Sequence, residues 1–184
     1  MRANALWAPW RLSYIQGERP DGREIGTKSS GTMDWRQGAD RDCCLCRAAA
    51  AMGHEKSLGV LDRRDGCVVL TNRFPYASGH LLVAPLDHRA GLLDLESSVT
   101  LALQERLTEW CEILTRSIGA EGFNIGLNVG RVAGAGVPGH LHWHIVPRWS
   151  GDTNFMPVTA GVRVLSQSLD SLWEQLHATR MADA

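Results

Sequence analysis

Three histidines occupy alternate positions in the segment His140-Leu141-His142-Trp143-His144. Successive side chains of a β-strand point to opposite faces of a sheet, so an extended segment places the three imidazoles on one face and the two apolar residues on the other. A solvated strand face more naturally carries a mixture of Thr, Lys and Glu. The spacing therefore indicates a functional face, whose chemistry is either metal chelation or reaction at phosphorus.

The segment that precedes the histidines favours phosphate chemistry. Residues 130–139 are rich in glycine and include Gly134, Gly136 and Gly139. Glycine lets the backbone approach a ligand closely, and successive N–H groups can form an anion-binding concavity beside the imidazoles. Neutral imidazole is a competent nucleophile near pH 7, and a phosphohistidine divides one hard displacement into two easier ones. We expect the central residue, His142, to be the nucleophile, with a flanking imidazole donating a hydrogen bond to the phosphoryl oxygens.

A second candidate site lies near the beginning of the chain. The spacing Cys43-x-x-Cys46 is that of half a tetrahedral zinc site, which needs two further ligands. The alternative is a pair of reduced thiols, with Cys44 as a small buried residue. Three of the five cysteines crowd into this segment, which suits a metal site or free thiols better than a disulfide framework and indicates a reducing compartment.

Hydrophobic periodicity predicts the elements that would position these residues. Apolar residues recur at three- and four-residue steps over 97–118 and Gly119 follows, which predicts one long amphipathic helix. Shorter apolar runs and turn residues predict the other elements, namely strands at 67–70, 80–84, 123–129 and 141–146 and helices at 47–52 and 166–177. The fold class expected is α+β, an antiparallel sheet covered by one long helix. Residues 1–42 read as an N-terminal arm and loop, and 43–184 as a single catalytic domain.

Composition excludes several classes of function. The 184 residues are 44% hydrophobic and 21% charged, which is typical of one globular domain. A formal net charge of −1 provides no general attraction to nucleic acid or to an anionic membrane. The N-terminus lacks the continuous apolar core of a secretory signal, and no stretch approaches the roughly 18 to 20 apolar residues of a membrane span. We therefore expect a cytoplasmic protein with neither nucleic acid nor membrane as a partner.

The segment from His140 to Val146 resembles the His-x-His-x-His-x-x signature of the histidine-triad superfamily. A second motif supports this resemblance, because Asn72 stands three residues before Pro75 and Gly79-His80 enters a strand. The two motifs and their spacing cover roughly residues 60 to 150. The resemblance implies an HIT-like fold and a catalytic set of three histidines in which His142 is the nucleophile, His144 contacts the phosphate and His140 is the third member.

The resemblance also implies roles for other residues. Asn72 would hydrogen-bond the ribose hydroxyls, His80 would line the nucleotide pocket, and Asn128 would contact ribose or phosphate. The α-phosphate would be held by backbone amides of the glycine-rich loop, at Gly134, Gly136 and Val137. This loop departs from the usual Gln-Ser/Thr-Val-x approach to the triad, because it reads Gly136-Val137-Pro138-Gly139.

Members of the superfamily that carry the cysteine pair resemble this chain in two further histidines. The resemblance implies that His88 and His140 complete the set begun by Cys43 and Cys46. A zinc ion held by four protein ligands would be structural and could not itself activate water.

Residues 6–11, Leu-Trp-Ala-Pro-Trp-Arg, together with residues 147–158, resemble the bacterial branch of diadenosine tetraphosphate phosphorylases. In that branch inorganic phosphate takes the nucleotidyl group. The sequence thus predicts cleavage of a dinucleoside polyphosphate by phosphorolysis or hydrolysis, in a protein that is a homodimer like many of the superfamily. Three alternatives stay open: a nucleoside phosphoramidate or adenylyl hydrolase, a nucleotide-binding module without catalysis, and a metalloenzyme built on the triad.

Overall fold

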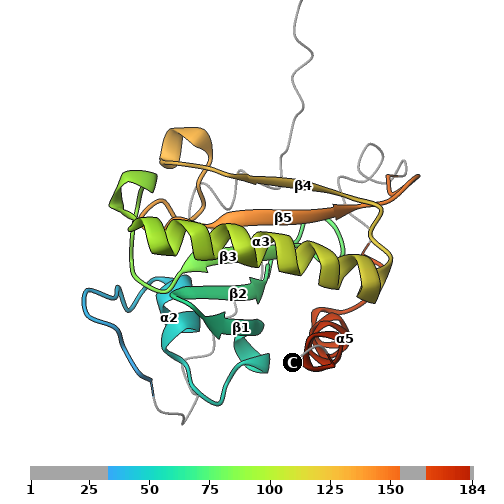
Figure 1. Ribbon diagram of the computed structural model, residues 1–184, viewed down its shortest axis with the longest axis horizontal. Helices are drawn as coiled ribbons and strands as arrows, with labels where there is room; N and C mark the ends of the chain where they lie inside the picture. The colour runs from blue at the N-terminus through green and yellow to red at the C-terminus, as the bar shows by residue number, and fades with distance from the viewer. Residues whose placement is uncertain (1–32, 154–164, 183–184) are drawn as a thin grey trace, which may run out of the picture.

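The computed structural model of the chain describes residues 33–153 and 165–182. Within these ranges five strands form one antiparallel sheet in the order β1-β2-β3-β5-β4 (Figure 1). The strands are β1 (Val60–Arg64), β2 (Cys67–Thr71), β3 (Leu81–Pro85), β4 (Gly122–Leu127) and β5 (Trp143–Arg148). Strand β5 therefore lies between β3 and the edge strand β4, and the histidine segment enters the sheet at its start.

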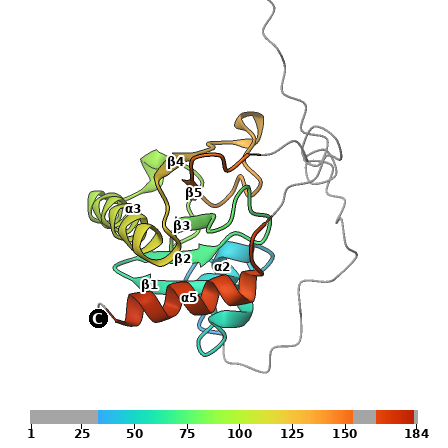
Figure 2. The ribbon, with the colours of Figure 1, turned by 90° about the vertical axis from the view of Figure 1, so that its right-hand side faces the viewer.

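Helices lie on both faces of the sheet. Helix α3 (Ser97–Ile118) covers one face, α2 (Cys44–Ala50) lies on the opposite face, and α5 (Leu169–Met181) runs beside β1 (Figure 2). Three short 3-10 turns complete the described elements, η1 (Lys56–Leu58), η2 (Leu92–Asp94) and η3 (Arg131–Ala133). The fold is α+β with an antiparallel sheet covered by one long helix, as the sequence predicts.

Helix α3 packs against the sheet through its apolar stripe. Leu103, Leu107, Trp110 and Leu114 are buried against strand residues of the same core cluster. The helix ends where expected, because Gly119 adopts a left-handed conformation (φ 64°) and its N–H bonds the carbonyl of Thr115. Burial of this stripe is the main reason the helix lies where it does, since helical propensity alone contributes little.

A second apolar cluster holds α2 on the other face. Leu45 and Ala48 of the helix pack with residues of β2 and β3, including Val68 and Ala84. The Arg63 guanidinium of β1 donates to the carbonyls of Ala48 and Ala51 at 2.9 and 2.7 Å, which satisfies the last carbonyls of α2. The short helix is thereby fixed to the sheet at both its side and its end.

Several boundaries differ from the sequence prediction. Strand β1 was not predicted, because its run Val-Leu-Asp-Arg-Arg carries three charged residues. Its buried carboxylate, Asp62, is compensated by Arg180 at 2.6 Å and Arg64 at 3.0 Å. The other shifts are small: α2 begins at 44 instead of 47, β5 begins at 143 instead of 141, and α5 spans 169–181 instead of 166–177.

Two parts of the predicted pattern lie outside the described residues, namely the segment 6–11 and the end of the motif 147–158 beyond residue 153. Among the residues that the structure does describe, no helix combines the length and the apolar character that crossing a bilayer would require.

Candidate active site and metal centre

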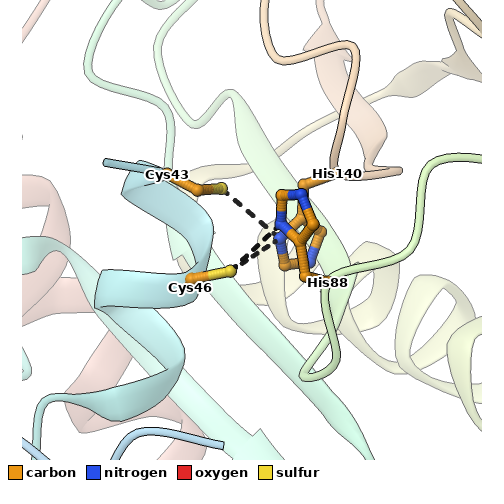
Figure 3. Close-up of side chains that lie close together, drawn as sticks. All are labelled: Cys43, Cys46, His88 and His140. Carbon is orange, nitrogen blue, oxygen red and sulfur yellow. Dashed lines mark hydrogen bonds between the residues drawn. The ribbon is translucent and has the colours of Figure 1, made fainter. Parts of the chain in front are cut away.

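Four side chains from three separate segments converge beside α2 (Figure 3). Cys43 and Cys46 stand at the beginning of the helix, His88 follows β3, and His140 precedes β5. The Sγ atom of Cys46 lies 3.2 Å from Nδ1 of His88 and 3.4 Å from Nδ1 of His140, and Sγ of Cys43 lies 3.5 Å from the same His140 nitrogen. The four ligand atoms all lie within 4.8 Å of one another, so the structure brings together the complete predicted metal-binding set.

The donor set fits a tetrahedral zinc ion. With Zn–S near 2.3 Å and Zn–N near 2.0 to 2.1 Å, sulfur and nitrogen ligands would lie about 3.5 Å apart, close to the spacings of these side chains. Nε2 of His140 lies 2.8 Å from the carbonyl of Pro85, which can only accept, so Nε2 carries the proton and the Nδ1 lone pair faces the sulfurs. Burial raises the pKa of the Cys46 thiol to about 11, and a bound cation is what would hold it as thiolate.

The segment that carries His140 runs very close to the loop that carries His88. A Cβ atom at Gly139 would stand 3.2 Å from Nε2 of His88, so the absence of a side chain permits this approach. The N–H of Leu141 donates to the carbonyl of Arg89 at 2.6 Å. Residues 139–141 are thus bound to the loop after β3 before the chain enters β5.

His142 is held in one orientation and one tautomer. Its Nδ1 lies 2.8 Å from the main-chain carbonyl of His140, which can only accept, so Nδ1 carries the proton and Nε2 presents a lone pair. The side chain is buried, with 5% of its surface exposed, and this burial lowers its pKa below the ordinary histidine value. A neutral imidazole with an available Nε2 lone pair is the form a nucleophile requires.

His144 belongs to a chain of hydrogen bonds that begins at the backbone. The N–H of Tyr76 donates to Nδ1 of His80 at 3.0 Å, so His80 carries its proton on Nε2. That Nε2 lies 2.9 Å from Nδ1 of His144, which accepts the bond and leaves the proton of the neutral ring on Nε2. The rings of His142 and His144 are adjacent, with centroids 5.1 Å apart. A ring with a lone pair on Nε2 and a ring with a proton on Nε2 are thus neighbours.

The structure separates the apolar side chains of the histidine segment from the histidines. Trp143 and Ile145 pack in the core cluster under α3, as expected for the apolar face. His140 faces the cysteines at the start of α2 (Figure 3), and α2 lies on the side of the sheet opposite α3 (Figure 2), while the rings of His142 and His144 are adjacent. The first histidine is therefore directed to the metal cluster and the other two to each other.

Two of the predicted substrate-binding residues, Asn72 and His80, contact each other. The Asn72 side chain lies 3.3 Å from both ring nitrogens of His80, and its Oδ1 accepts a hydrogen bond from the N–H of Phe74. Asn128 follows Leu127, which is paired with Trp143.

The glycine-rich loop is hydrogen-bonded to the segment that carries the histidines. The carbonyl of Val137 accepts from the N–H of His140 at 3.2 Å, and Gly134 has a positive φ of 90°. Within the described residues, no hydrogen bond uses the backbone amides of Gly136 and Val137, which leaves these N–H groups available to an anion.

Sequence reasoning missed several main-chain groups that organise the site. The amide of Tyr76 and the carbonyls of Pro85 and Arg89 set the tautomers and the path of the chain. Gly126 of β4 is paired with His144 and places no side chain beside it. Backbone groups carry no residue-type signal, so nothing in the sequence could have identified them.

Fold and site together define a class of protein. The HIT domain family model matches residues 54–151, and the chain belongs to the HIT (histidine triad) family.

Among relatives, the AP-4-A phosphorylase of Mycobacterium tuberculosis is 32% identical over 167 residues, which are 89% of this chain and 77% of that protein. The adenosine 5′-monophosphoramidase of Schizosaccharomyces pombe is 32% identical over 74 residues, 40% of this chain and 52% of that protein. A crystal structure of a zinc-bound histidine triad family protein from Mycobacterium smegmatis has the same fold, with a TM-score of 0.62 and 23% identity over 77% of this chain and 96% of that one.

Proposed function

We propose that this protein cleaves dinucleoside polyphosphates, diadenosine tetraphosphate first among them, through a covalent nucleotidyl-His142 intermediate. The observation that carries the proposal is the hydrogen bond from Nδ1 of His142 to the His140 carbonyl, which puts the proton on Nδ1 and leaves the lone pair on Nε2, in a ring adjacent to that of His144. The 32% identity to an AP-4-A phosphorylase over most of the chain supports this substrate class.

In the first step, Nε2 of His142 attacks the α-phosphorus, and the bond from phosphorus to the bridging oxygen breaks. The departing nucleoside polyphosphate takes the electron pair of that bond. The Nε2–H of His144 donates to the phosphoryl group, and the amides of Gly136 and Val137 stabilise the negative charge that develops there. In the second step, inorganic phosphate or water attacks the same phosphorus and releases His142.

The remaining residues hold the substrate and its catalytic groups in place. Asn72 and Asn128 contact the ribose, and Gly134 shapes the loop that carries the phosphate-binding amides. His80 fixes the tautomer of His144 through their 2.9 Å hydrogen bond. His140 acts in the catalytic set through its carbonyl, which holds the nucleophile.

We also propose that Cys43, Cys46, His88 and His140 bind a structural zinc ion. The spacing of the four side chains and the zinc-bound relative from M. smegmatis support this assignment. Zinc would cross-link the start of α2 to the segment after β3 and to the segment before β5. Its role would be structural, because a site closed by four protein ligands has no position for a substrate or water.

The first test is the substitution His142→Asn. Because the nucleophile is lost while the pocket is retained, we expect turnover of diadenosine tetraphosphate to fall by about 10⁴-fold or more, with nucleotide binding preserved. Steady-state kinetics and calorimetric binding of AMP measure the two effects. His54→Asn, outside every motif, is the matched control. Substantial turnover by the His142 variant would reject the covalent mechanism.

Product analysis separates the possible acceptors. With inorganic phosphate as acceptor, diadenosine tetraphosphate yields ADP and ATP, whereas water yields AMP and ATP. We expect ADP to replace AMP as phosphate is raised. The S. pombe relative favours a second candidate, a nucleoside phosphoramidate hydrolase, for which adenosine 5′-monophosphoramidate would be the better substrate in the same assay.

We further propose a homodimer formed through β4. This strand is at the edge of the sheet, and Ile125 is 48% exposed although it belongs to a strand. Just beyond β4, Val129 is also exposed. An exposed apolar edge strand is a template for pairing with a second strand, and a two-fold axis would pair β4 with its own copy.

A further inference from the structure

We infer that the Cys43, Cys46, His88 and His140 cluster positions the nucleophile, so that a bound metal ion determines the orientation of the His142 ring as well as the stability of the fold. This inference rests on the proposed role of His142 as nucleophile. It assigns the cluster a second role beyond the structural one given above.

His140 connects the metal site to the nucleophile, because its side chain belongs to the first and its main chain contacts the second. Its side chain is completely buried, with Nδ1 directed at the two sulfurs and Nε2–H bonded to the Pro85 carbonyl. The main-chain carbonyl of the same residue accepts the 2.8 Å hydrogen bond from Nδ1 of His142. A shift of the His140 ring would therefore move the acceptor that orients the nucleophile.

A second connection holds the same segment from the other side. Gly139 lies against His88, and the N–H of Leu141 is bonded to the carbonyl of Arg89. Two of the four cluster residues, His88 and His140, therefore stand in segments that contact each other directly beside His142. A metal ion ligated by both would set the spacing of these segments, whereas thiols are only weak hydrogen-bond donors and could not hold it as firmly.

The expected effect on turnover follows from the geometry of attack. A displacement of about 1 Å at a reacting group can cost about 10²-fold in rate. The ribose contacts proposed at Asn72 and Asn128 lie outside the cluster. Loss of the metal should therefore lower kcat much more than it raises KM, a division that general loss of folded protein does not predict.

The experiment uses the full chain labelled with ¹⁵N-histidine, compared with and without zinc after treatment with a chelator. NMR reports whether Nδ1–H of His142 is present and protected from exchange, with far-UV circular dichroism as the measure of folding. We expect the signal in the zinc-bound protein, its loss after zinc removal, a fall of kcat by about 10²-fold with KM changed less than about twofold, and recovery on adding zinc.

Substitution of neighbouring cysteines supplies a matched pair. Cys46→Ser removes a ligand and should behave like the zinc-free protein. Cys44→Ser, two positions earlier, should behave like the unaltered chain, because Cys44 is exposed and not buried as the sequence predicted. A protected Nδ1–H of His142 that persists unchanged in folded, zinc-free protein would overturn the inference.

If zinc removal unfolds the chain, a further variant tests whether the cluster orients the His142 ring. Gly139→Ala retains every ligand, but its Cβ would press on His88, which a bound metal ion would hold in place. We expect zinc to remain bound while the His142 signal shifts and kcat falls; an unchanged signal would reject the inference. Because the NMR signal needs no substrate, this result stands apart from whether dinucleoside polyphosphates are cleaved.

Discussion

Gly79, directly before His80, is required by both its backbone conformation and its surroundings. Its φ is 78°, and a Cβ there would stand 2.5 Å from Cδ1 of Ile118 and 3.1 Å from Cγ of Pro147. Gly119 has a similar φ of 64°, but a Cβ there would meet nothing within 4 Å. The two glycines thus share a backbone cost on substitution and differ in steric crowding.

We expect Gly79→Ala to lower the free energy of unfolding by about 1 to 3 kcal/mol more than Gly119→Ala does, because overpacking adds to the cost of a positive φ. Urea denaturation of both variants measures the difference. Equal losses would show that the surroundings of residue 79 yield freely.

At this scale the sequence predicted candidate residues and a role for each, but not the main-chain groups that orient them. The alternating histidines and the cysteine pair are local patterns, and the structure brings Cys43, Cys46, His88 and His140 together as expected. The division of the triad depends on partners such as the Pro85 carbonyl, 55 residues away in the chain. Contacts of this kind depend on tertiary structure, which spacing along one strand does not encode.

Among the elements, β1 is joined to α5 and α3 through the buried carboxylate of Asp62. Arg180 of α5 lies 2.6 Å from one of its oxygens, and Arg64 and Arg106 lie 3.0 and 3.8 Å from the other. Only 3% of the Asp62 side chain is exposed. Among the described residues, removing this charge would leave Arg180 without an ion-pair partner and would weaken the pairing of Arg106, whose closest remaining partner is Glu109.

We expect Asp62→Asn to destabilise the protein by about 3 to 5 kcal/mol, the range for breaking a buried ion pair from one side. Thermal and urea unfolding measure the loss. Lys56→Ala, which breaks an exposed pair with Glu174, is the control and should change stability little. If both variants unfolded alike, the buried network would contribute no more than a surface ion pair.

The elements that the sequence predicted well are those with strong periodicity. Helix α3 has the predicted bounds because its apolar stripe is regular and Gly119 ends it. Strand β1 was not predicted because the charge of Asp62 is compensated by Arg180, a residue far away in the sequence. The start of α2 was placed three residues late because cysteines have low helical propensity, and packing against β2 and β3 overrides it.

The whole molecule presents one edge strand whose apolar residues suggest a partner. Under the proposed dimer, Ile125→Lys should shift the mass measured by light scattering from twice 20.2 kDa toward 20.2 kDa, because a lysine on an edge strand opposes strand pairing. Met181→Lys, at the exposed end of α5, should leave the mass unchanged. A monomeric mass for the unaltered chain would exclude the β4 interface.

The hydrogen bond from the Tyr76 amide to His80 makes the site tolerant of substitutions at position 76. A peptide N–H does not titrate, and only proline among the encoded residues removes it. The tautomers of His80 and His144 are therefore set by a backbone group that every residue except proline would supply at position 76. Evolution can exchange the tyrosine ring, whose centroid lies 4.7 Å from that of His80 at a tilt of 41°, without changing the tautomers of His80 and His144.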